Sequence, residues 1–232
     1  MHIQHKKPTG GFIAGTPVWT DRGLVPIEKI CVGDMVLSRC KETGAQEHQR
    51  VSKTFTMENQ IIWTVNIWGA NKKEKDKEIE EYFFTKGDQL FWKCRPDWWD
   101  DEVSGEFGHE GWSSVETFNV THLLCMNGQT ALIERPHEVT RQFAPNTGIA
   151  MSDARGEWGW QIIQGPAGEL FNSPSYSRYM HGMRISENEG NLQQTLEPFL
   201  ATVYNITVEK YHSYFVGQLG VWVNEISDSN IL

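Results

Sequence analysis

The stretch from Gly11 to Ser38 reads GFIAGTPVWTDRGLVPIEKICVGDMVLS and decides the fold class. Short apolar runs alternate there with small residues, and turn-forming residues interrupt them at Asp21–Gly23 and Val32–Asp34. Gly and Asp favour tight turns, because Gly tolerates positive φ and Asp can bond to the backbone two residues on. The pattern predicts three short strands, at Phe12–Thr20, Leu24–Ile30 and Met35–Leu37.

The same rhythm continues along the chain. Further strands are predicted at Val51–Met57, Gln60–Trp68, Tyr82–Thr85, Gln89–Trp92, Leu123–Met126, Thr130–Ile133, Val203–Val208, Tyr214–Val216 and Val221–Val223. The first two alternate so strongly that we expect them to pair with each other. Asn127–Gly128 has the chemistry of a hairpin turn. Ten Trp, eleven Phe, six Tyr and 21 Gly indicate a compact, mainly β fold, since aromatic side chains suit strands and Gly suits turns.

Between residues 135 and 198 the strand pattern is lost, and Gly, Pro, Ser and Asn are frequent. This composition predicts a long irregular insertion before the last strands. The predicted organisation is a linker or artificial edge at 1–10, a β body at 11–134 and 199–226, an insertion or subdomain at 135–198, and a tail at 227–232. The charge run at Asn71–Glu81 is expected to be a solvated hairpin tip or short helix, and acidic Cys94–Glu110 a solvated loop.

Charge and composition exclude several classes of protein. With 232 residues and a formal net charge of −9, the chain lacks the overall basic character of a duplex-binding module. No apolar stretch is long enough to cross a bilayer, so no membrane span is expected. No secretory signal peptide opens the sequence. Cys31, Cys40, Cys94 and Cys125 show no zinc-binding spacing, and we expect unpaired thiols, with a disulfide as the alternative.

Three blocks of sequence resemble the Hint domain, the fold shared by hedgehog autoprocessing domains and inteins, and above all the pretoxin Hint domains of bacterial polymorphic toxins. The first block is Gly11–Ser38, which follows the family pattern Cys-Phe-x-Ala-Gly-Thr, Pro-Ile-Glu-x-Ile and Val-Gly-Asp-x-Val-Leu-Ser. The second runs from Thr85 to Trp92 and continues through Gly111–Trp112 and Leu123–Gly128. The third is Thr202–Val223, with Tyr211–Gly217 at its centre. The resemblance implies a compact all-β intein-like fold.

The resemblance also implies a reaction, the cleavage of the domain's own backbone. In such domains a Cys at the first position attacks the preceding carbonyl and converts the amide to a thioester. A Thr-x-x-His pair holds the amide and protonates its nitrogen. In splicing members, a terminal His-Asn pair frees the other end of the domain.

This sequence departs from the family at each of these points. Gly11 occupies the nucleophile position, Lys86 and Gln89 occupy the Thr-x-x-His positions, and Asn224 and Glu225 occupy the terminal pair. A Gln side chain can form hydrogen bonds but is not an acid or base near neutral pH. We therefore expect a Hint fold that no longer processes itself.

The pretoxin resemblance implies a setting in large secreted effectors of the Rhs or PAAR type, delivered as cargo by type VI secretion and acting in a target cell. Our first hypothesis is that the domain is itself the C-terminal toxin module, a hydrolase or nuclease neutralised by an immunity protein. A non-enzymatic binding or spacer module that engages the parent effector polypeptide or the secretion apparatus is the alternative. Residual autoproteolysis is the second alternative.

Candidate catalytic residues for a new activity are His212, His137 and His181. Of these, His212 lies in the third block, where the old centre is expected. A His with a carboxylate activates water or holds a metal, so a divalent metal would be the cofactor of a nuclease. Aromatic residues of the insertion could stack on nucleic acid bases or form the core of the insertion: Trp158, Trp160, Tyr176 and Tyr179.

Overall fold

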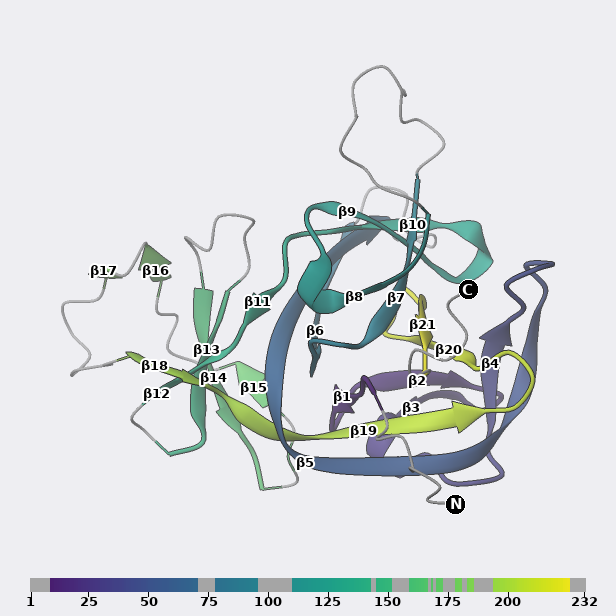
Figure 1. Cartoon of the computed structure of the whole chain (residues 1–232), viewed down its shortest axis with the longest axis horizontal. Coiled ribbons are helices and arrows are strands. Elements are labelled where there is room, and N and C mark those ends of the chain that lie inside the picture. The colour runs from purple at the N-terminus through teal and green to yellow at the C-terminus, as the bar shows by residue number, and fades with distance from the viewer. Residues whose placement is uncertain are drawn as a thin grey trace, which may run out of the picture.

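The computed structural model describes residues 9–70, 78–95, 110–142, 145–151, 159–166, 168, 170–172, 178–180, 183–185 and 194–225. Most of the described chain is in β-strands, so the predicted mainly β fold is confirmed (Figure 1). In the part of the chain that the structure describes, three short 3-10 helices accompany the strands: η1 (Ile27–Lys29), η3 (Val115–Thr117) and η4 (Met126–Gly128). No helix in the described part of the chain is long and apolar enough to cross a membrane.

One large sheet forms the body of the protein. Its strands are β1 (Phe12–Ile13), β2 (Pro17–Thr20), β3 (Gly23–Pro26), β4 (Met35–Arg39), β5 (Gln46–Ala70), β6 (Glu78–Lys86), β7 (Leu90–Cys94), β8 (Gly111–Ser114), β9 (Thr121–Leu124), β10 (Thr130–Ile133), β11 (His137–Glu138), β19 (Leu200–Val208), β20 (Ser213–Val216) and β21 (Val221–Asn224). The order is β10-β9-β7-β21-β20-β2-β4-β5-β19-β1-β6. Because β10 also pairs with β5, the sheet returns on itself. Strands from both ends of the sequence lie side by side, since β1 pairs with β19 and β2 with β20.

The long strand β5 corrects one prediction. Val51–Met57 and Gln60–Trp68 do not pair with each other, because both belong to this single strand of 25 residues. Its first part pairs with β4, its middle with β19 and its last part with β6. Val51–Met57 therefore pairs with β19, and most of Gln60–Trp68 pairs with β6. The alternating pattern reflects these two pairings along one strand. Figure 1 shows β5 curving around the body, with β19 beside it.

The insertion is more regular than predicted. Within it the structure has a separate five-stranded sheet, formed by β12 (Thr140–Gln142), β13 (Thr147–Met151), β14 (Gly159–Gln164), β15 (Leu170–Asn172) and β18 (Gln194–Pro198). A small hairpin, β16 (Arg178–Met180) and β17 (Met183–Ile185), forms the third sheet. A buried apolar cluster joins the five-stranded sheet to the body, with Ile162 and Val139 packed near Ile62 and Phe199.

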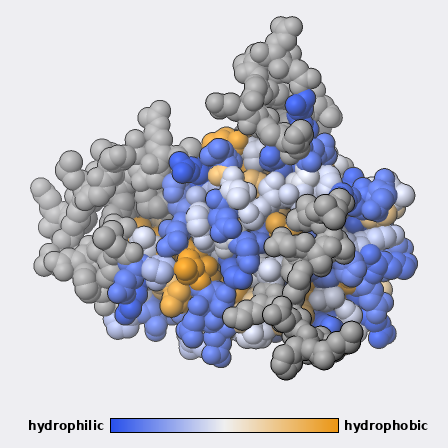
Figure 2. All heavy atoms as spheres, in the orientation of Figure 1, coloured by the Kyte–Doolittle hydropathy of each residue, from blue (hydrophilic) through white to orange (hydrophobic). Residues whose placement is uncertain are grey.

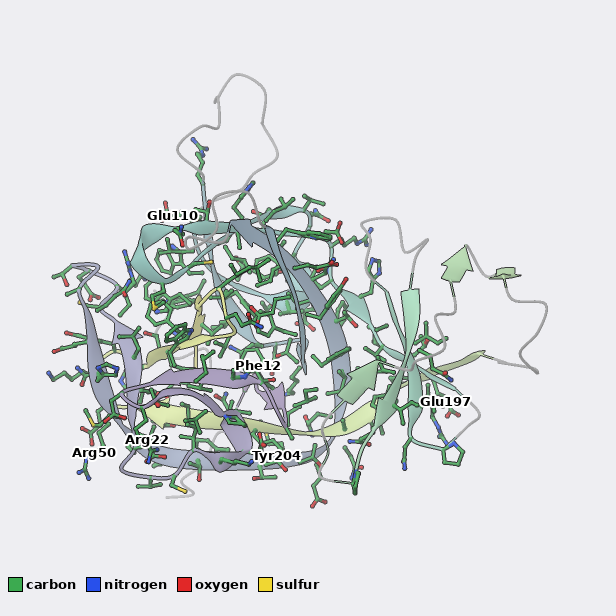
Figure 3. All side chains as sticks on the ribbon, turned by 180° about the vertical axis from the view of Figure 1, so that it is seen from behind. Phe12, Arg22, Arg50, Glu110, Glu197 and Tyr204 are labelled. Atoms are coloured by element: carbon green, nitrogen blue, oxygen red, sulfur yellow. The ribbon has the colours of Figure 1, made fainter. Side chains whose placement is uncertain are left out.

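Aromatic side chains fill the core of the body. Phe12, Phe83, Phe91 and Phe118 form a chain of ring contacts with centroids 6.0 to 6.3 Å apart. Burying a Phe side chain contributes roughly 1.5–3 kcal/mol, so this cluster is a large part of the folding free energy. Figure 3 labels Phe12 and Tyr204, which are cross-strand partners on β1 and β19. The space-filling view in Figure 2 shows a mainly hydrophilic face with apolar residues in small separate groups.

Candidate functional site

The segment before β1 is held by the turn that joins β6 to β7. The Gly11 N–H donates to Gln89 Oε1 at 2.7 Å. The Gly11 carbonyl accepts from Thr85 Oγ1 at 2.6 Å and from the Lys86 N–H at 3.0 Å. Both polar groups of the Gly11 backbone are therefore fixed by residues at the positions of the family's Thr-x-x-His motif or directly beside them.

The residue before Gly11 is held from the same turn. The Gly10 N–H donates to Asp88 Oδ1 at 2.9 Å, and Lys86 Nζ donates to Asp88 Oδ2 at 2.8 Å. Gly10 has a φ of 68°, and a Cβ added there would lie 2.4 Å from Gln89 Oε1. Only glycine fits this position without a displacement, because both the left-handed φ and the neighbouring amide oxygen disfavour a side chain.

Asn205, in the middle of β19, holds the carbonyl one residue further upstream. Its Nδ2 donates to the Thr9 carbonyl at 2.8 Å. Its Oδ1 accepts from the Tyr214 hydroxyl and from the Ile206 N–H, both at 2.8 Å. Asn205 is 2% exposed and Tyr214 is fully buried, so burial raises the pKa of Tyr214 and keeps its hydroxyl protonated as a donor. The two side chains thus hold the upstream chain in one conformation.

Gln89 connects the two ends of the domain. Besides accepting from Gly11, its Nε2 donates to the Asn224 carbonyl at 2.9 Å and to the Leu90 carbonyl at 3.0 Å. The side chain is fully buried. Both of its N–H groups and its oxygen are therefore engaged, and Gln89 acts as a fixed link between β1 and the end of β21.

His212 and Glu225 form a pair at the outer end of this region. His212 Nδ1 lies 2.8 Å from Glu225 Oε1, and the Val208 N–H donates to Oε2. Burial raises the pKa of Glu225 to about 7, against the smaller lowering effects of His212, Val208 and Lys53. The Glu225 side chain is 5% exposed and that of His212 is 46% exposed. A His oriented by a buried carboxylate has the arrangement of a general base.

The structure brings most of the predicted positions together and separates others. Gly11, Lys86, Gln89, Asn224 and Glu225 lie on neighbouring elements linked by the hydrogen bonds above.

The other candidate histidines are placed differently. His137 lies on β11 opposite Thr64 of β5, whereas His212 is in the turn between β19 and β20; Figure 1 shows these elements on different parts of the body. His181, Trp158 and Tyr176 lie outside the described residues, as do the tail 227–232 and the first eight residues.

No metal centre is present among the residues that the structure describes, where no three His, Cys, Asp or Glu side chains gather. The carboxylates of the acidic loop between 96 and 109 lie outside those residues. None of the four cysteines, all of which the structure describes, forms a disulfide, as favoured from their spacing. Cys31 is exposed after η1, with its thiol directed at the Lys29 carbonyl.

Sequence reasoning missed the residues that hold the upstream chain. Asn205, Thr85 and Asp88 were recognised only as parts of sequence blocks, although they bond directly to Thr9, Gly11 and Gly10. The available signal was a polar residue inside an otherwise apolar strand, Val203–Val208. A buried Asn in such a strand needs partners for its amide.

The structure resembles solved inteins. A bacterial intein-like domain from Clostridium thermocellum is 20% identical, with 92% of this chain and 97% of that chain covered and a TM-score of 0.51. The Ssp DnaB mini-intein variant M86 is 8% identical, with 96% and 98% covered and a TM-score of 0.49. A DnaB intein from Synechocystis sp. PCC 6803 is 8% identical, with 94% and 100% covered and a TM-score of 0.49. No family model and no curated protein matches the sequence.

The fold is therefore that of the intein-like, or Hint, class. Within that fold, Gly11 and Gln89 stand where the Hint resemblance predicts a Cys nucleophile and a His, and they are joined by a hydrogen bond.

Proposed function

We propose that this chain is a non-processing Hint domain of a bacterial polymorphic toxin, which keeps its upstream connection intact instead of cutting it. The observation that carries the proposal is the hydrogen bond from the Gly11 N–H to Gln89. The peptide between Gly10 and Gly11 is the one that a processing domain would cleave. Here its nitrogen donates to an amide oxygen, which cannot protonate it.

The position directly after the Gly10–Gly11 peptide bond offers no nucleophile for cleavage. Thioester formation needs a thiol one residue after the attacked carbonyl, and Gly11 has no side chain. A Cβ added to Gly11 would lie 3.0 Å from the Tyr204 carbonyl and 3.1 Å from Val203 Cγ2, at a φ of +121°. The backbone itself therefore disfavours a cysteine, since strain of this kind costs about 1–3 kcal/mol.

We predict that a fusion carrying a folded marker domain before Met1 stays intact, and that Gly11→Cys does not restore cleavage. The reason is that the new thiol would be strained and Gln89 would supply no proton. Intact mass, measured before and after incubation with hydroxylamine, checks this result. Gly23→Cys is the matched control, because Gly23 has a φ of +96° with nothing within 4 Å of the added Cβ.

Two outcomes would contradict the proposal. Cleavage of the unmodified fusion between Gly10 and Gly11 would show residual autoproteolysis through an unusual route. Efficient cleavage by Gly11→Cys would show that only the nucleophile was lost. Gly11→Cys should also lower the thermal midpoint more than Gly23→Cys, since crowding adds roughly 1–3 kcal/mol to the strain.

A second candidate function is favoured by the pair of His212 and Glu225. An exposed imidazole whose Nδ1 faces a buried carboxylate can activate water, which suits a hydrolase or nuclease. In this reading the domain is itself the toxin, delivered as cargo by a type VI secretion system and neutralised by an immunity protein.

Expression in bacteria tests the toxin hypothesis, in the cytoplasm and in the periplasm, with and without co-expression of a candidate immunity protein. Growth arrest would support the toxin hypothesis. If His212→Ala relieves the arrest while His137→Ala and His181→Ala do not, His212 and Glu225 are supported as the active site. Normal growth in both compartments would leave the non-enzymatic module as the function.

A further inference from the structure

The end of strand β21 is closed against the turn that joins β19 to β20, and Figure 1 shows β20 and β21 side by side. The Glu225 N–H donates to the His212 carbonyl at 3.2 Å. One carboxylate oxygen of Glu225 lies 2.8 Å from His212 Nδ1, and the other accepts from the Val208 N–H. We call these three residues the Glu225 clasp, since they hold the first residue after β21 against the body.

The carboxyl group of the clasp is buried, although the imidazole that faces it is not. The Glu225 side chain is almost inaccessible to solvent, whereas the His212 side chain is largely exposed. Burial raises the pKa of Glu225 to about 7, and the opposing effects of His212, Val208 and Lys53 are smaller. Glu225 therefore keeps its proton at mildly acidic pH, where an exposed glutamate is already ionised.

In the described part of the chain, three elements bring charged or titratable side chains to Glu225. These side chains are His212 from the turn, Lys53 from β5 and Tyr214 from β20, while β19 contributes the Val208 N–H. Tyr214 is fully buried and its pKa is raised, so it stays uncharged. A negative charge on Glu225 is thus balanced from the exposed side chains of Lys53 and His212. A buried charge costs more than a buried neutral acid, so ionisation favours an open clasp in which water reaches the carboxylate.

The elements on either side of the clasp are fixed by other contacts. The turn is attached to β5, because the Tyr211 hydroxyl donates to Glu47 Oε1 at 2.5 Å. The end of β21 is attached to the turn before β7, because Gln89 Nε2 donates to the Asn224 carbonyl at 2.9 Å. These two contacts do not use the Glu225 side chain. Opening of the clasp therefore begins after Asn224 and leaves the turn and β21 in place.

We propose that the Glu225 clasp is a proton-dependent switch at the end of β21. While Glu225 is protonated, it holds the chain after Asn224 against the turn between β19 and β20. Loss of the proton lets that chain separate from the turn. The switch acts downstream of the last strand and needs no substrate, so it is tested separately from both functions proposed above.

The test is amide hydrogen exchange, followed by NMR on the whole chain between pH 5 and pH 8 and corrected for the intrinsic exchange rate. The Val208 and Glu225 amides should exchange through a local opening. Its equilibrium constant should rise about tenfold per pH unit between about 5 and 7, since opening releases one proton, and should level off above that range. The Val51 and Val139 amides donate to backbone carbonyls in the core and should stay at least about tenfold better protected.

Three variants separate the proton from the other contacts. Glu225→Gln keeps an oxygen for the Val208 N–H but does not titrate, so the local opening should become independent of pH. His212→Asn suits the left-handed φ of 51° at this position. It should raise the opening constant about fivefold, through the loss of one hydrogen bond, and retain the dependence on pH. Glu58→Gln, the same change at an exposed site on β5, should behave as the unmodified protein.

Two results would overturn the proposal. Equal protection of Val208, Glu225 and Val51 would show that the clasp opens only when the whole domain unfolds. This comparison uses the unmodified protein, so it decides even if a variant folds poorly. A Glu225→Gln protein whose local opening still rises tenfold per pH unit would show that another group controls it.

Discussion

Asn205→Leu is expected to lower the free energy of unfolding by about 3–5 kcal/mol, because one substitution leaves three partners without a bond. The Tyr214 hydroxyl, the Ile206 N–H and the Thr9 carbonyl all bond to the Asn205 amide. Leucine has a similar volume but no polar atom. Urea denaturation followed by far-ultraviolet circular dichroism measures the loss, and amide exchange at Gly10 and Gly11 reports whether the upstream segment is released.

Tyr214→Phe is the graded comparison for this prediction. It removes only one of the three bonds, so it should cost about 1–2 kcal/mol. In the double variant the loss should be smaller than the sum of the single losses, since both changes delete the same hydrogen bond. An Asn205→Leu loss no greater than that of Tyr214→Phe would mean that Asn205 does not hold the upstream chain.

The free energy of unfolding is expected to fall as the pH rises from about 4.5 to about 7, by on the order of 3 kcal/mol. Folding raises the pKa of Glu225 from its ordinary value of 4.5 to about 7. Between these two values the folded protein holds more protons than the unfolded chain, so raising the pH favours unfolding. The stabilisation is complete below the lower value and is lost above the higher one.

Glu225→Gln removes this titration, so its pH profile should be flatter than that of the unmodified protein over the same window. Glu58→Gln is the matched control, an identical change at an exposed site on β5. Urea midpoints measured at intervals between pH 4 and pH 8 give the comparison. Profiles of equal slope for Glu225→Gln and the unmodified protein would assign the dependence to other groups.

The fold class was predictable because the motifs at the two ends of the chain are local in sequence. Turn residues at Asp21–Gly23 and Val32–Asp34 separate β2, β3 and β4 much as expected. The pairing of β5 was not predictable, since alternation shows which face of a strand is buried but not which strand covers it. The strands of the insertion were missed because their alternation is short and interrupted by Gly, Pro and Ser.

The residues of the candidate site were predictable where they belong to a sequence motif. They were not predictable where their role depends on a contact with a residue far away in the sequence. Gly11 and Gln89 were placed from the blocks, and the structure joins them by a hydrogen bond. The roles of Asn205 and Asp88 depend on residues 196 and 78 positions away, and no spacing rule reports such distances. Gly10 was also missed, because its need for glycine arises from the Gln89 oxygen beside it.

The position of β1 determines how the body would respond to mechanical tension. β1 pairs with β19 on one side and with β6 on the other, and the chain before it is tethered through Thr9, Gly10 and Gly11. A pull on the upstream chain would therefore load an interior strand, and no edge strand could peel away first. Unfolding under such a pull would require the hydrogen bonds at Thr9, Gly10 and Gly11 and the pairing of β1 with both β19 and β6 to break together, so this end of the domain should resist mechanical force.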